Sequence, residues 1–300
     1  MFTISIVNIQ KLLDSEKIEY KYIGKNDLEV NGFSSLKNYK EGNITWVKNN
    51  ESIPKSIDIN NLNLVVIQED INVNFQNQII TNESKRAFFT IVEHFFTEPK
   101  ETMAVGYNTY ISPGVSLGEN VQIGHNCVLD GNIEIADGTK IFNNVTLVNN
   151  IKIGKNCEVQ SGTTIGHDGF GYVEHADNVK SMVKHFGGVK IGDNVHISGN
   201  CCIARGTIDD TVVEDGCKFD SNCFVAHNCI IGKNSALVAG TAILGSVTLG
   251  ENAYIASATI KNQLNIGSNS LVGVGAVVLK DVKPNEVVAG VPAKVINYKE

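Results

Sequence analysis

An apolar residue stands at every sixth position through most of this 300-residue chain, and this period limits the possible folds more than any other pattern in it. From Val105 to Ile165, all eleven positions in this register hold Val, Ile or Leu. The register resumes from Ile191 to Ile203 and from Val213 to Ile255, and it ends one residue out of step at Val278. A period of six matches neither the 3.6-residue period of a helix nor the alternation of a simple strand.

This period is typical of a parallel β-helix, in which three sextets close one coil and each apolar side chain points inward. Twenty-six sextets can be counted, which predicts roughly nine coils at a spacing of about 4.8 Å. The residues that follow the apolar position are often Gly, Asn or Asp, as in IGHN, IGKN, IGDN and LGEN. These residues favour the tight corner conformations that a coil requires.

Six of the seven cysteines occupy one slot of the repeat, four residues after the apolar position. Other members of the slot are small or β-branched, as at Val121, Val145 and Thr241. A free cysteine packs as a small hydrophobe, so we predict buried structural thiols rather than a metal site or disulfides. The six are Cys127, Cys157, Cys201, Cys217, Cys223 and Cys229.

The register is interrupted twice. Twenty extra residues separate Ile165 from Ile191, and they predict an inserted loop over roughly residues 167–186. Four extra residues lie around residues 206–210. Long loops on a regular scaffold tend to carry function.

The flanking segments lack the repeat, which predicts three parts: residues 1–98 as an α+β domain, residues 99–281 as the β-helix, and residues 282–300 as a short tail. In the first part, the apolar pattern predicts helices near residues 8–15 and 83–96. It predicts strands near residues 28–30, 44–47 and 64–67. The second helix places Phe88, Ile91, Val92 and Phe95 on one face.

The formal charge is −7, which argues against nucleic-acid binding. No run of 18 apolar residues exists, so no transmembrane segment is expected. The first residues lack the charged and apolar regions of a secretory signal, and we therefore expect a cytoplasmic protein.

Four elements follow one another in the second half of the chain: GHDGFGY, GGVKIGDNVHISGN, ARGTIDDTVVEDG and AHNCIIG. Near the N-terminus stand ISIVNIQKLL and LEVNGFSSLKNYKEGNITWVKN. In these elements the chain resembles the UDP-3-O-acylglucosamine N-acyltransferases of lipid A synthesis, over about residues 3–255. The repeat alone marks only the wider hexapeptide acyltransferase superfamily.

The resemblance implies a left-handed parallel β-helix that forms a homotrimer, with active sites between neighbouring columns. It implies that His227, in the AHN element, is the general base that accepts a proton from the substrate amine. It implies that the backbone amide of Gly245 stabilises the oxyanion. Three sextets, or one full coil, separate the two positions, so we expect them to lie side by side in adjacent coils. Trp46 and Asn49 match a uracil-binding element, while Ser52 replaces a further aromatic residue of the family.

Histidine suits the base because its ordinary pKa lies near neutral pH, and direct attack on a thioester requires no catalytic cysteine. Further candidates compete with ordinary structural roles. His167, Phe170 and Tyr172 belong to the inserted loop, and His185 stands where the family often has a polar residue near the substrate. Asp220 either orients the base or caps a corner of the column.

The C-terminal part departs from the lipid A enzymes. Residues 258–266 lack the second functional histidine of that family, and GVGAVVLKDVKPNEVVAGVPAKVI resembles the end of acetyl-CoA-dependent hexapeptide acetyltransferases. Gly273, Gly275 and Lys280 are therefore candidate contacts for the pantetheine and phosphates of CoA.

The first hypothesis is an N-acyltransferase, with acetyl-CoA or another acyl-CoA as donor and a UDP- or dTDP-linked amino sugar as acceptor. The alternative is the lipid A N-acyltransferase itself, which takes a hydroxyacyl chain from an acyl carrier protein. A third hypothesis is a non-catalytic β-helix scaffold. No metal is expected, because His196 and His227 lack a suitable spacing for a zinc site.

Overall fold

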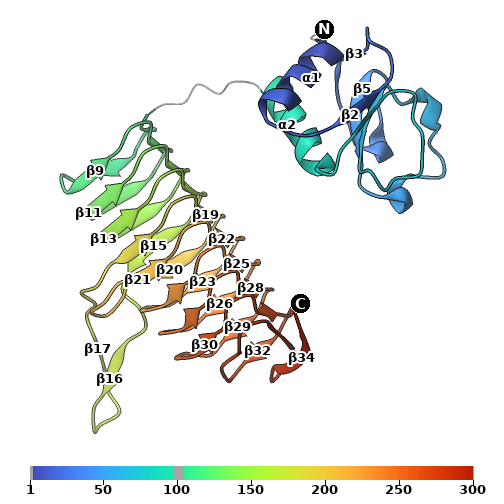
Figure 1. Ribbon diagram of the computed structural model, residues 1–300. Coiled ribbons are helices and arrows are strands. Elements are labelled where there is room, and N and C mark those ends of the chain that lie inside the picture. The colour runs from blue at the N-terminus through green and yellow to red at the C-terminus, as the bar shows by residue number, and fades with distance from the viewer. Residues whose placement is uncertain (1–2, 98–103, 300) are drawn as a thin grey trace. The chain divides into compact units, whose positions relative to one another are not determined.

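A computed structural model describes residues 3–97 and 104–299 of the chain (Figure 1). The chain divides into two compact units, residues 1–101 and 102–300. The boundary predicted between residues 98 and 99 lies outside the described residues.

The N-terminal unit contains a five-stranded sheet and two helices. The sheet has the strand order β2-β7-β6-β5-β4, in which only the β2–β7 pair is antiparallel. The predicted helices and strands are confirmed within one or two residues at each end. The elements are β1 (Ile4–Ser5), α1 (Ile6–Ser15), β2 (Lys21–Ile23), β3 (Glu29–Val30), β4 (Gly32–Phe33), β5 (Asn43–Val47), β6 (Leu64–Ile67), β7 (Gln78–Ile80) and α2 (Ser84–Phe96), with short 3₁₀ turns at Leu36–Asn38, Asn50–Ser52 and Ile59–Asn61.

Local sequence explains both helices. Ser5 precedes α1, and its hydroxyl accepts a hydrogen bond from the amide of Asn8, which satisfies one of the free donors at the helix start. In α2, Phe88 and Ile91 are buried in one core with strand residues such as Leu64. The apolar face predicted for α2 is therefore the face that packs on the sheet.

The C-terminal unit is a column of parallel coils, and residues three sextets apart pair in adjacent coils: Ile123 lies beside Ile141, and Ile141 beside Val159. Three sextets per coil are confirmed. The apolar residues at the sixfold positions form one continuous buried core along the column. Hydrogen bonds between successive coils satisfy the backbone groups of the strands.

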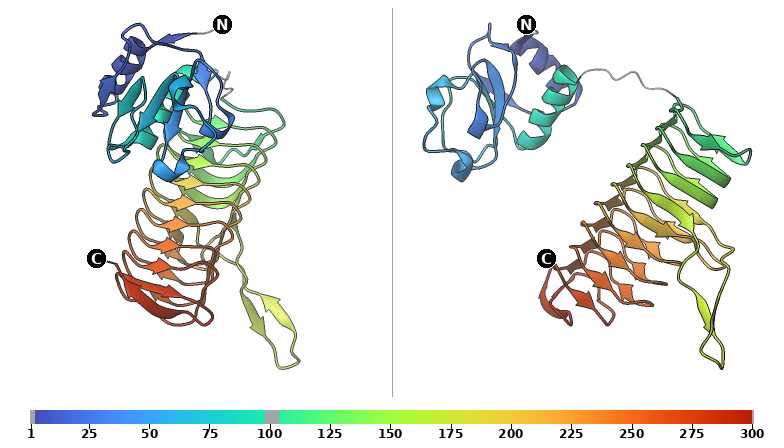
Figure 2. Two further views of the ribbon diagram at one scale, coloured as in Figure 1. Left: turned by 90° about the vertical axis from the view of Figure 1, so that its right-hand side faces the viewer. Right: turned by 180° about the vertical axis from the view of Figure 1, so that it is seen from behind.

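The coils form three faces (Figures 1 and 2). The first face contains β10 (Gln122–Ile123), β12 (Lys140–Ile141), β14 (Glu158–Val159), β19 (His196–Ile197), β22 (Lys218–Phe219), β25 (Ala236–Leu237), β28 (Tyr254–Ile255), β31 (Leu271–Val272), β33 (Glu286–Ala289) and β34 (Lys294–Tyr298). The long strands β11 (Val128–Ile135) and β13 (Thr146–Ile153) run through the corner between the other two faces.

The second face includes the first residues of β11 and β13. Its other members are β8 (Tyr110–Ile111), β15 (Thr164–His167), β20 (Cys202–Ala204), β23 (Phe224–Val225), β26 (Ala242–Ile243), β29 (Thr259–Ile260) and β32 (Val277–Val278). The third face includes the last residues of β11 and β13, together with β9 (Val115–Leu117), β18 (Val189–Ile191), β21 (Thr211–Val213), β24 (Ile230–Ile231), β27 (Thr248–Leu249) and β30 (Asn265–Ile266).

Asparagine makes many of the corners. Asn126, Asn156 and Asn234 have φ values of 55°, 53° and 56°, in the left-handed region that asparagine tolerates better than most residues. The prediction that polar residues after the apolar position form the corners is confirmed.

The longer insertion leaves the column as predicted. It forms a hairpin of β16 (Tyr172–Glu174) and β17 (Lys180–Met182), which projects from the coils in all three ribbon views (Figures 1 and 2). The column continues beyond it, because Val159 pairs directly with Ile197 although the whole insertion lies between them in the sequence. A regular ladder therefore runs past the insertion without a break.

The C-terminal end differs from the prediction. The sequence predicts that the column stops near residue 281, but β33 adds one more parallel strand, with Val287 beside Leu271. Val282 and Val288 continue the buried stack. The paired residues Leu271 and Val287 are separated by less than three full sextets, and Pro284 interrupts the repeat. The sixfold count therefore misses this coil. Strand β34 then folds back antiparallel to β33.

The cysteines lie where the repeat places them. All seven are free thiols, and the six in the common slot are buried, whereas Cys202 is half-buried. Burial raises the pKa of Cys217 and Cys229 to about 11. None of the described helices is long and apolar enough to cross a membrane.

These thiols yield a direct test of the column. Only the thiolate attacks a disulfide reagent, so at pH 8 the folded protein should expose one fast-reacting thiol at most, Cys202. All seven should react after unfolding in guanidinium chloride. Ellman's reagent measures both values, and Cys202→Ala should remove the fast phase. Rapid reaction of several thiols in the folded protein would contradict the buried slot.

Candidate active site

One corner of the column stacks the candidate base and oxyanion donor with three other residues in successive coils. The ladder pairs Ile203, Val225, Ile243, Ile260 and Val278 in order. The residues two positions later stack at the corner in the same order: Arg205, His227, Gly245, Asn262 and Lys280. Coils are about 4.8 Å apart, so Lys280 lies three coils, roughly 14 Å, along the column from His227.

The hydrogen bonds around His227 determine which ring nitrogen carries the proton. Nδ1 lies 3.0 Å from Oδ1 of Asn228. This Oδ1 also accepts hydrogen bonds from the amide and hydroxyl of Thr207, at 3.1 and 2.9 Å. A backbone amide only donates, so the Asn228 atom is an oxygen and Nδ1 of His227 carries the hydrogen. Nε2 of the neutral ring is then left with a free lone pair.

Gly245 lies directly against this free nitrogen. A Cβ atom on Gly245 would lie 2.9 Å from both Nε2 and Cε1 of His227. The amide nitrogen of Gly245 donates no hydrogen bond to any residue among 3–97 and 104–299, whereas its carbonyl accepts one from Gln263. The predicted neighbourhood of His227 and Gly245 is confirmed, and it places a free imidazole lone pair close to a residue whose backbone amide is unengaged.

The inserted loop covers His227 from another side. A Cβ on the buried Gly169 would lie 2.7 Å from Cδ2 of His227 and 3.0 Å from Nε2 of His185. The rings of His185 and His227 meet edge to face, with centroids 5.4 Å apart and planes at 79°. The ring of His227 therefore lies between two glycines, Gly169 and Gly245.

Arg205 holds the two ends of the inserted loop together. Its guanidinium is buried, Nε donates a hydrogen bond to the carbonyl of Gly187 at 2.6 Å, and one terminal nitrogen forms an ion pair with Asp168 at 3.8 Å. Asp168 is near the start of the loop and Gly187 follows its end. The repeat gives Arg205 no special place, although it belongs to the ARGTIDDT element, which was the only signal that could have marked it.

The other loop residues differ in exposure. His167 donates from Nδ1 to the carbonyl of Asp168 at 2.7 Å, so its Nε2 accepts from the thiol of Cys202 at 2.8 Å. Phe170 is 83% exposed, and its ring lies 4.8 Å from that of Tyr172. His185, in contrast, is fully buried.

Asp220 lies little more than one sextet before His227, at the preceding corner of the column. One of its oxygens accepts a hydrogen bond from the amide of Ser221 at 2.7 Å, and the other accepts from Ala239 at 3.2 Å. Of the two roles open to Asp220 from the sequence, these contacts correspond to the capping of a corner. Within the described chain no hydrogen bond or ion pair joins Asp220 to His227.

At the C-terminal end, the three candidate donor contacts differ in their surroundings. Gly275 has a φ of +71° and its missing Cβ would meet no atom within 4 Å, whereas a Cβ on Gly273 would lie 3.0 Å from that of Ala289. Lys280 is exposed. Residues 3–97 and 104–299 include no group of three or more His, Cys, Asp or Glu side chains that could hold a metal ion.

In the N-terminal unit, Trp46 is half-buried on strand β5. Its indole nitrogen donates to the hydroxyl of Ser84 at 3.1 Å, and its ring packs against Phe88 and Phe89, with centroids at 6.4 and 6.1 Å. Asn49 caps a short 3₁₀ turn by accepting from the amide of Ser52. The amide nitrogen of the Asn49 side chain makes no hydrogen bond within the described chain.

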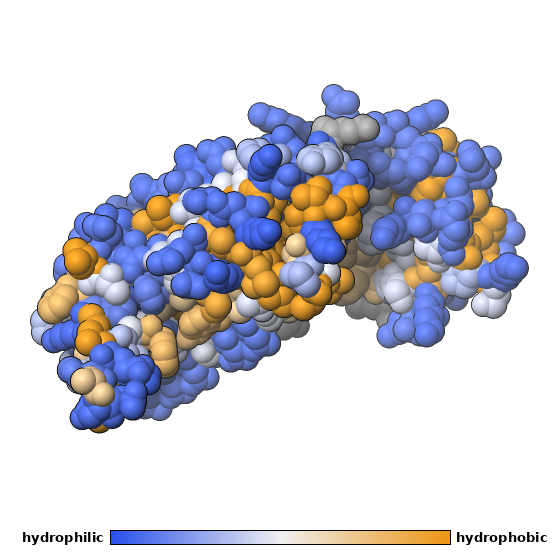
Figure 3. Space-filling view, turned by 90° about the horizontal axis from the view of Figure 1, so that it is seen from below, coloured by the Kyte–Doolittle hydropathy of each residue, from blue (hydrophilic) through white to orange (hydrophobic). Residues whose placement is uncertain are grey.

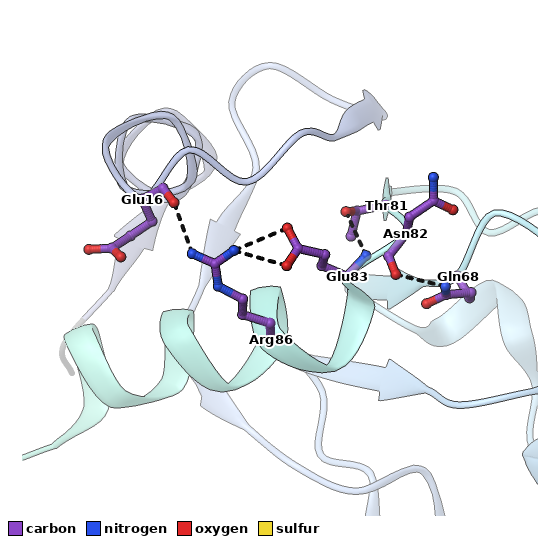
Figure 4. A network of polar contacts seen from close by, with 6 residues as sticks. All are labelled: Glu16, Gln68, Thr81, Asn82, Glu83 and Arg86. Carbon is purple, nitrogen blue, oxygen red and sulfur yellow. Dashed lines mark hydrogen bonds and ion pairs between the residues drawn. The ribbon is translucent and has the colours of Figure 1, made fainter. Parts of the chain in front are cut away.

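A polar network fixes the start of α2 (Figure 4). Arg86 donates to both carboxylate oxygens of Glu83 and to the carbonyl of Glu16. Gln68 donates to the carbonyl of Asn82 at 2.8 Å and accepts from Ser84, the partner of Trp46. A shallow, open pocket of about 570 Å³ lies next to this network, lined by Gln68, Asn82, Glu83, Ser84, Lys85, Arg86 and Phe89.

Family models agree with the repeat. Residues 132–167 match "Bacterial transferase hexapeptide (six repeats)", and residues 104–136 match "Hexapeptide repeat of succinyl-transferase". Together with the column and the histidine corner, these matches define a hexapeptide-repeat acyltransferase.

Two relatives that match most of the chain identify the family. The chain is 33% identical over 261 residues to UDP-3-O-acylglucosamine N-acyltransferase of Helicobacter pylori, covering 82% of this chain and 77% of that protein. It is 35% identical over 286 residues to the enzyme of the same name from Helicobacter hepaticus, covering 91% and 87%. The chain belongs to the UDP-3-O-acylglucosamine N-acyltransferase family. The predicted N-acyltransferase class is confirmed, and these names favour the lipid A alternative over the acetyl-CoA hypothesis.

Solved structures agree on the fold. UDP-N-acetylglucosamine O-acyltransferase from Moraxella catarrhalis matches with a TM-score of 0.61 and 23% identity, covering 65% of this chain and 75% of that one. UDP-N-acetylglucosamine acyltransferase from Francisella novicida matches with a TM-score of 0.58 and 25% identity, covering 64% and 69%. The predicted left-handed parallel β-helix is confirmed.

The substitution Gly245→Ala tests whether this corner is the active site. The added methyl would lie 2.9 Å from the ring of His227 and would displace it, so activity should fall about 100-fold, the usual cost of a misplaced catalytic group. Gly199→Ala is the matched control, because Gly199 occupies the same slot of another sextet and its Cβ would meet only the Ser161 carbonyl at 3.1 Å. Acyl-transfer kinetics and thermal melts of both variants provide the comparison. Equal activity in the two variants would argue against this corner as the site.

Proposed function

We propose that the protein transfers an acyl chain from a carrier-protein thioester to the amine of a UDP-linked 3-O-acylated glucosamine, as the names of its relatives suggest. The observation that carries the proposal is the pairing of a free imidazole lone pair on His227 with the unengaged amide of Gly245. A base and an oxyanion donor in adjacent coils are the two groups that aminolysis of a thioester requires.

The reaction follows from this geometry. The neutral substrate amine attacks the thioester carbonyl, and Nε2 of His227 takes a proton from the nitrogen as the carbon–nitrogen bond forms. The oxygen of the tetrahedral intermediate accepts a hydrogen bond from the amide of Gly245. The carbon–sulfur bond then breaks, and the protonated His227 returns its proton to the departing thiolate. The products are an amide and a free carrier thiol.

Neighbouring residues support these steps. Asn228 keeps the proton on Nδ1, which leaves Nε2 available as the base. Asp220 caps the adjoining corner, so we place it in the support of the coil rather than at the reacting atoms. His167, Phe170 and Tyr172 belong to the loop that covers this corner, and we assign them to the acceptor sugar.

The nucleotide would bind through the N-terminal unit. The ring of Trp46 would stack on uracil, and the unengaged amide nitrogen of Asn49 would donate to an oxygen of the base. The hydroxyl of Ser52 accepts a hydrogen bond from the backbone amide of Asn49 and completes the capping box of this turn, so position 52 has a structural role here.

A homotrimer of columns is part of the proposal. Phe186 is 68% exposed and Ile208 is 81% exposed, and each lies in one of the two insertions. Figure 3 shows apolar residues gathered on part of the surface of the column. A neighbouring column would cover this surface, because large exposed apolar patches usually mark interfaces.

The donor subsite would lie further along the same corner. Lys280 is suited to a phosphate, and Gly275 leaves space for an extended chain, whereas Gly273 lies close to Ala289 and would contribute only its backbone. Coenzyme A and an acyl carrier protein both present a phosphopantetheine arm, so these residues fit either donor. The acetyl-CoA hypothesis still rests on the C-terminal sequence, and an experiment must compare the two donors.

His227→Ala should lower the turnover number by about 100- to 10,000-fold, the range that general base catalysis provides. Thiol release and product mass, followed with acyl carrier protein and CoA donors in parallel, measure the effect. His125→Ala is the matched control, since His125 occupies the same slot of the repeat and stacks on Tyr107. Preference for the CoA thioester would overturn the carrier-protein donor, and near-normal turnover in the His227 variant would overturn the base.

Trp46→Leu should raise the KM for the nucleotide sugar roughly tenfold at unchanged turnover, because stacking contributes to binding rather than to the chemical step. Titration with free UDP supplies an independent binding constant. Phe33→Leu serves as control: Phe33 is another half-exposed aromatic residue of the same unit, on the edge strand β4. An unchanged KM in the Trp46 variant would place the uracil elsewhere.

A further inference from the structure

His185 has a buried nitrogen atom without a partner. Its Nδ1 lies 2.9 Å from the carbonyl of Val183, and because a carbonyl only accepts, Nδ1 carries a hydrogen. Its Nε2 is buried and makes no hydrogen bond within the described chain. A second hydrogen on Nε2 would leave a buried donor unsatisfied, which is costly. The ring is therefore neutral, with a bare lone pair on Nε2.

The surroundings of this lone pair lead to His227. A single point, the Cβ position of Gly169, lies 3.0 Å from Nε2 of His185 and 2.7 Å from Cδ2 of His227. The two rings meet edge to face at 5.4 Å. Nε2 of His185 has almost no solvent-exposed surface, so it does not reach a substrate directly. Any part it plays in the reaction acts through His227.

The elements packed around His227 carry both charged and uncharged residues. Arg205, which is positively charged, precedes it in the corner stack. Gly245 and Asn262, the next two corner residues, are uncharged. Of the carboxylates in the inserted loop, that of Asp168 is paired with Arg205. In the shorter insertion, the backbone carbonyl of Asp209 accepts a hydrogen bond from the side-chain amide of Asn228. The carboxylate of Asp209 is a further charged group of this insertion.

We infer that His185 is a positioning residue for the base: its fixed lone pair stabilises the protonated form of His227 during the reaction and holds the ring in place. The inference rests on the proposed role of His227. The imidazolium spreads positive charge over its ring hydrogens, and the lone pair of a neutral imidazole on the Cδ2 side attracts that charge. Arg205 keeps His185 in register by joining both ends of the loop that carries it.

The test uses two substitutions that separate the nitrogens of His185. His185→Asn keeps a donor near Nδ1, which preserves the bond to Val183, but it removes the acceptor at Nε2. Turnover should fall roughly tenfold, with KM values unchanged within about twofold. The acid limb of the rate profile should move to lower pH by about half a unit or more, because His227 becomes harder to protonate.

His185→Gln places an amide oxygen near the position of Nε2. Compared with His185→Asn, it should restore part of the turnover and reverse part of the shift in the acid limb. His175→Asn is the matched control, because His175 lies on the exposed hairpin. An NMR titration of the protein labelled with ¹³C-histidine, with the His227 signal assigned from His227→Ala, should show the same shift in the midpoint. This readout requires no activity, so it separates the inference from the proposed function.

A fall in turnover without a shift of the midpoint in either measurement would overturn the inference, since it would mean that His185 only supports the loop. Gly169→Ala provides a second check, because its methyl would separate the two rings. It should lower turnover more than Gly171→Ala, whose Cβ would lie 3.1 Å from Cε1 of His185 and has no close contact with His227. Equal effects of the two substitutions would also contradict the inference.

Discussion

The backbone ladder between successive coils holds the column together and sets the place of every side chain on it. Each strand of a coil donates and accepts hydrogen bonds with the coils on either side, and the apolar side chains of three faces fill the interior. A residue is therefore stacked on the residue one coil later. Proline would remove a donor from this ladder, and none occurs between Gly114 and Lys283.

The same ladder explains how a site arises on a repetitive scaffold. A regular corner presents a column of side chains at a spacing of about 4.8 Å, which is suitable for a base and an oxyanion donor in adjacent coils. Both insertions leave the column beside this corner. The longer insertion covers His227, and Arg205 fastens its ends.

Much of the fold was predictable from local pattern. The sixfold period determines the coil and its interior, and the helices of the N-terminal unit follow from their apolar faces. The final coil escaped prediction because Pro284 and a shortened spacing hide Val282 and Val288 from a strict count. The family, suggested by the AHN and RGTIDDT elements, is supported by relatives that match most of the chain.

The order of amino acids was enough to predict the repeat, the buried thiols and the pairing of His227 with Gly245, because in a β-helix a fixed number of residues corresponds to a fixed place in space. The part played by the insertion became visible only in three dimensions. Gly169 and His185 reach His227 through a loop that lacks the repeat, and Arg205 fastens the ends of this loop. The separations of Gly169 and His185 from His227 in the sequence carry no information about distance. The proton on Nδ1 of His227 also follows only from the contacts of Asn228 with Thr207, which bring the shorter insertion and a coil together.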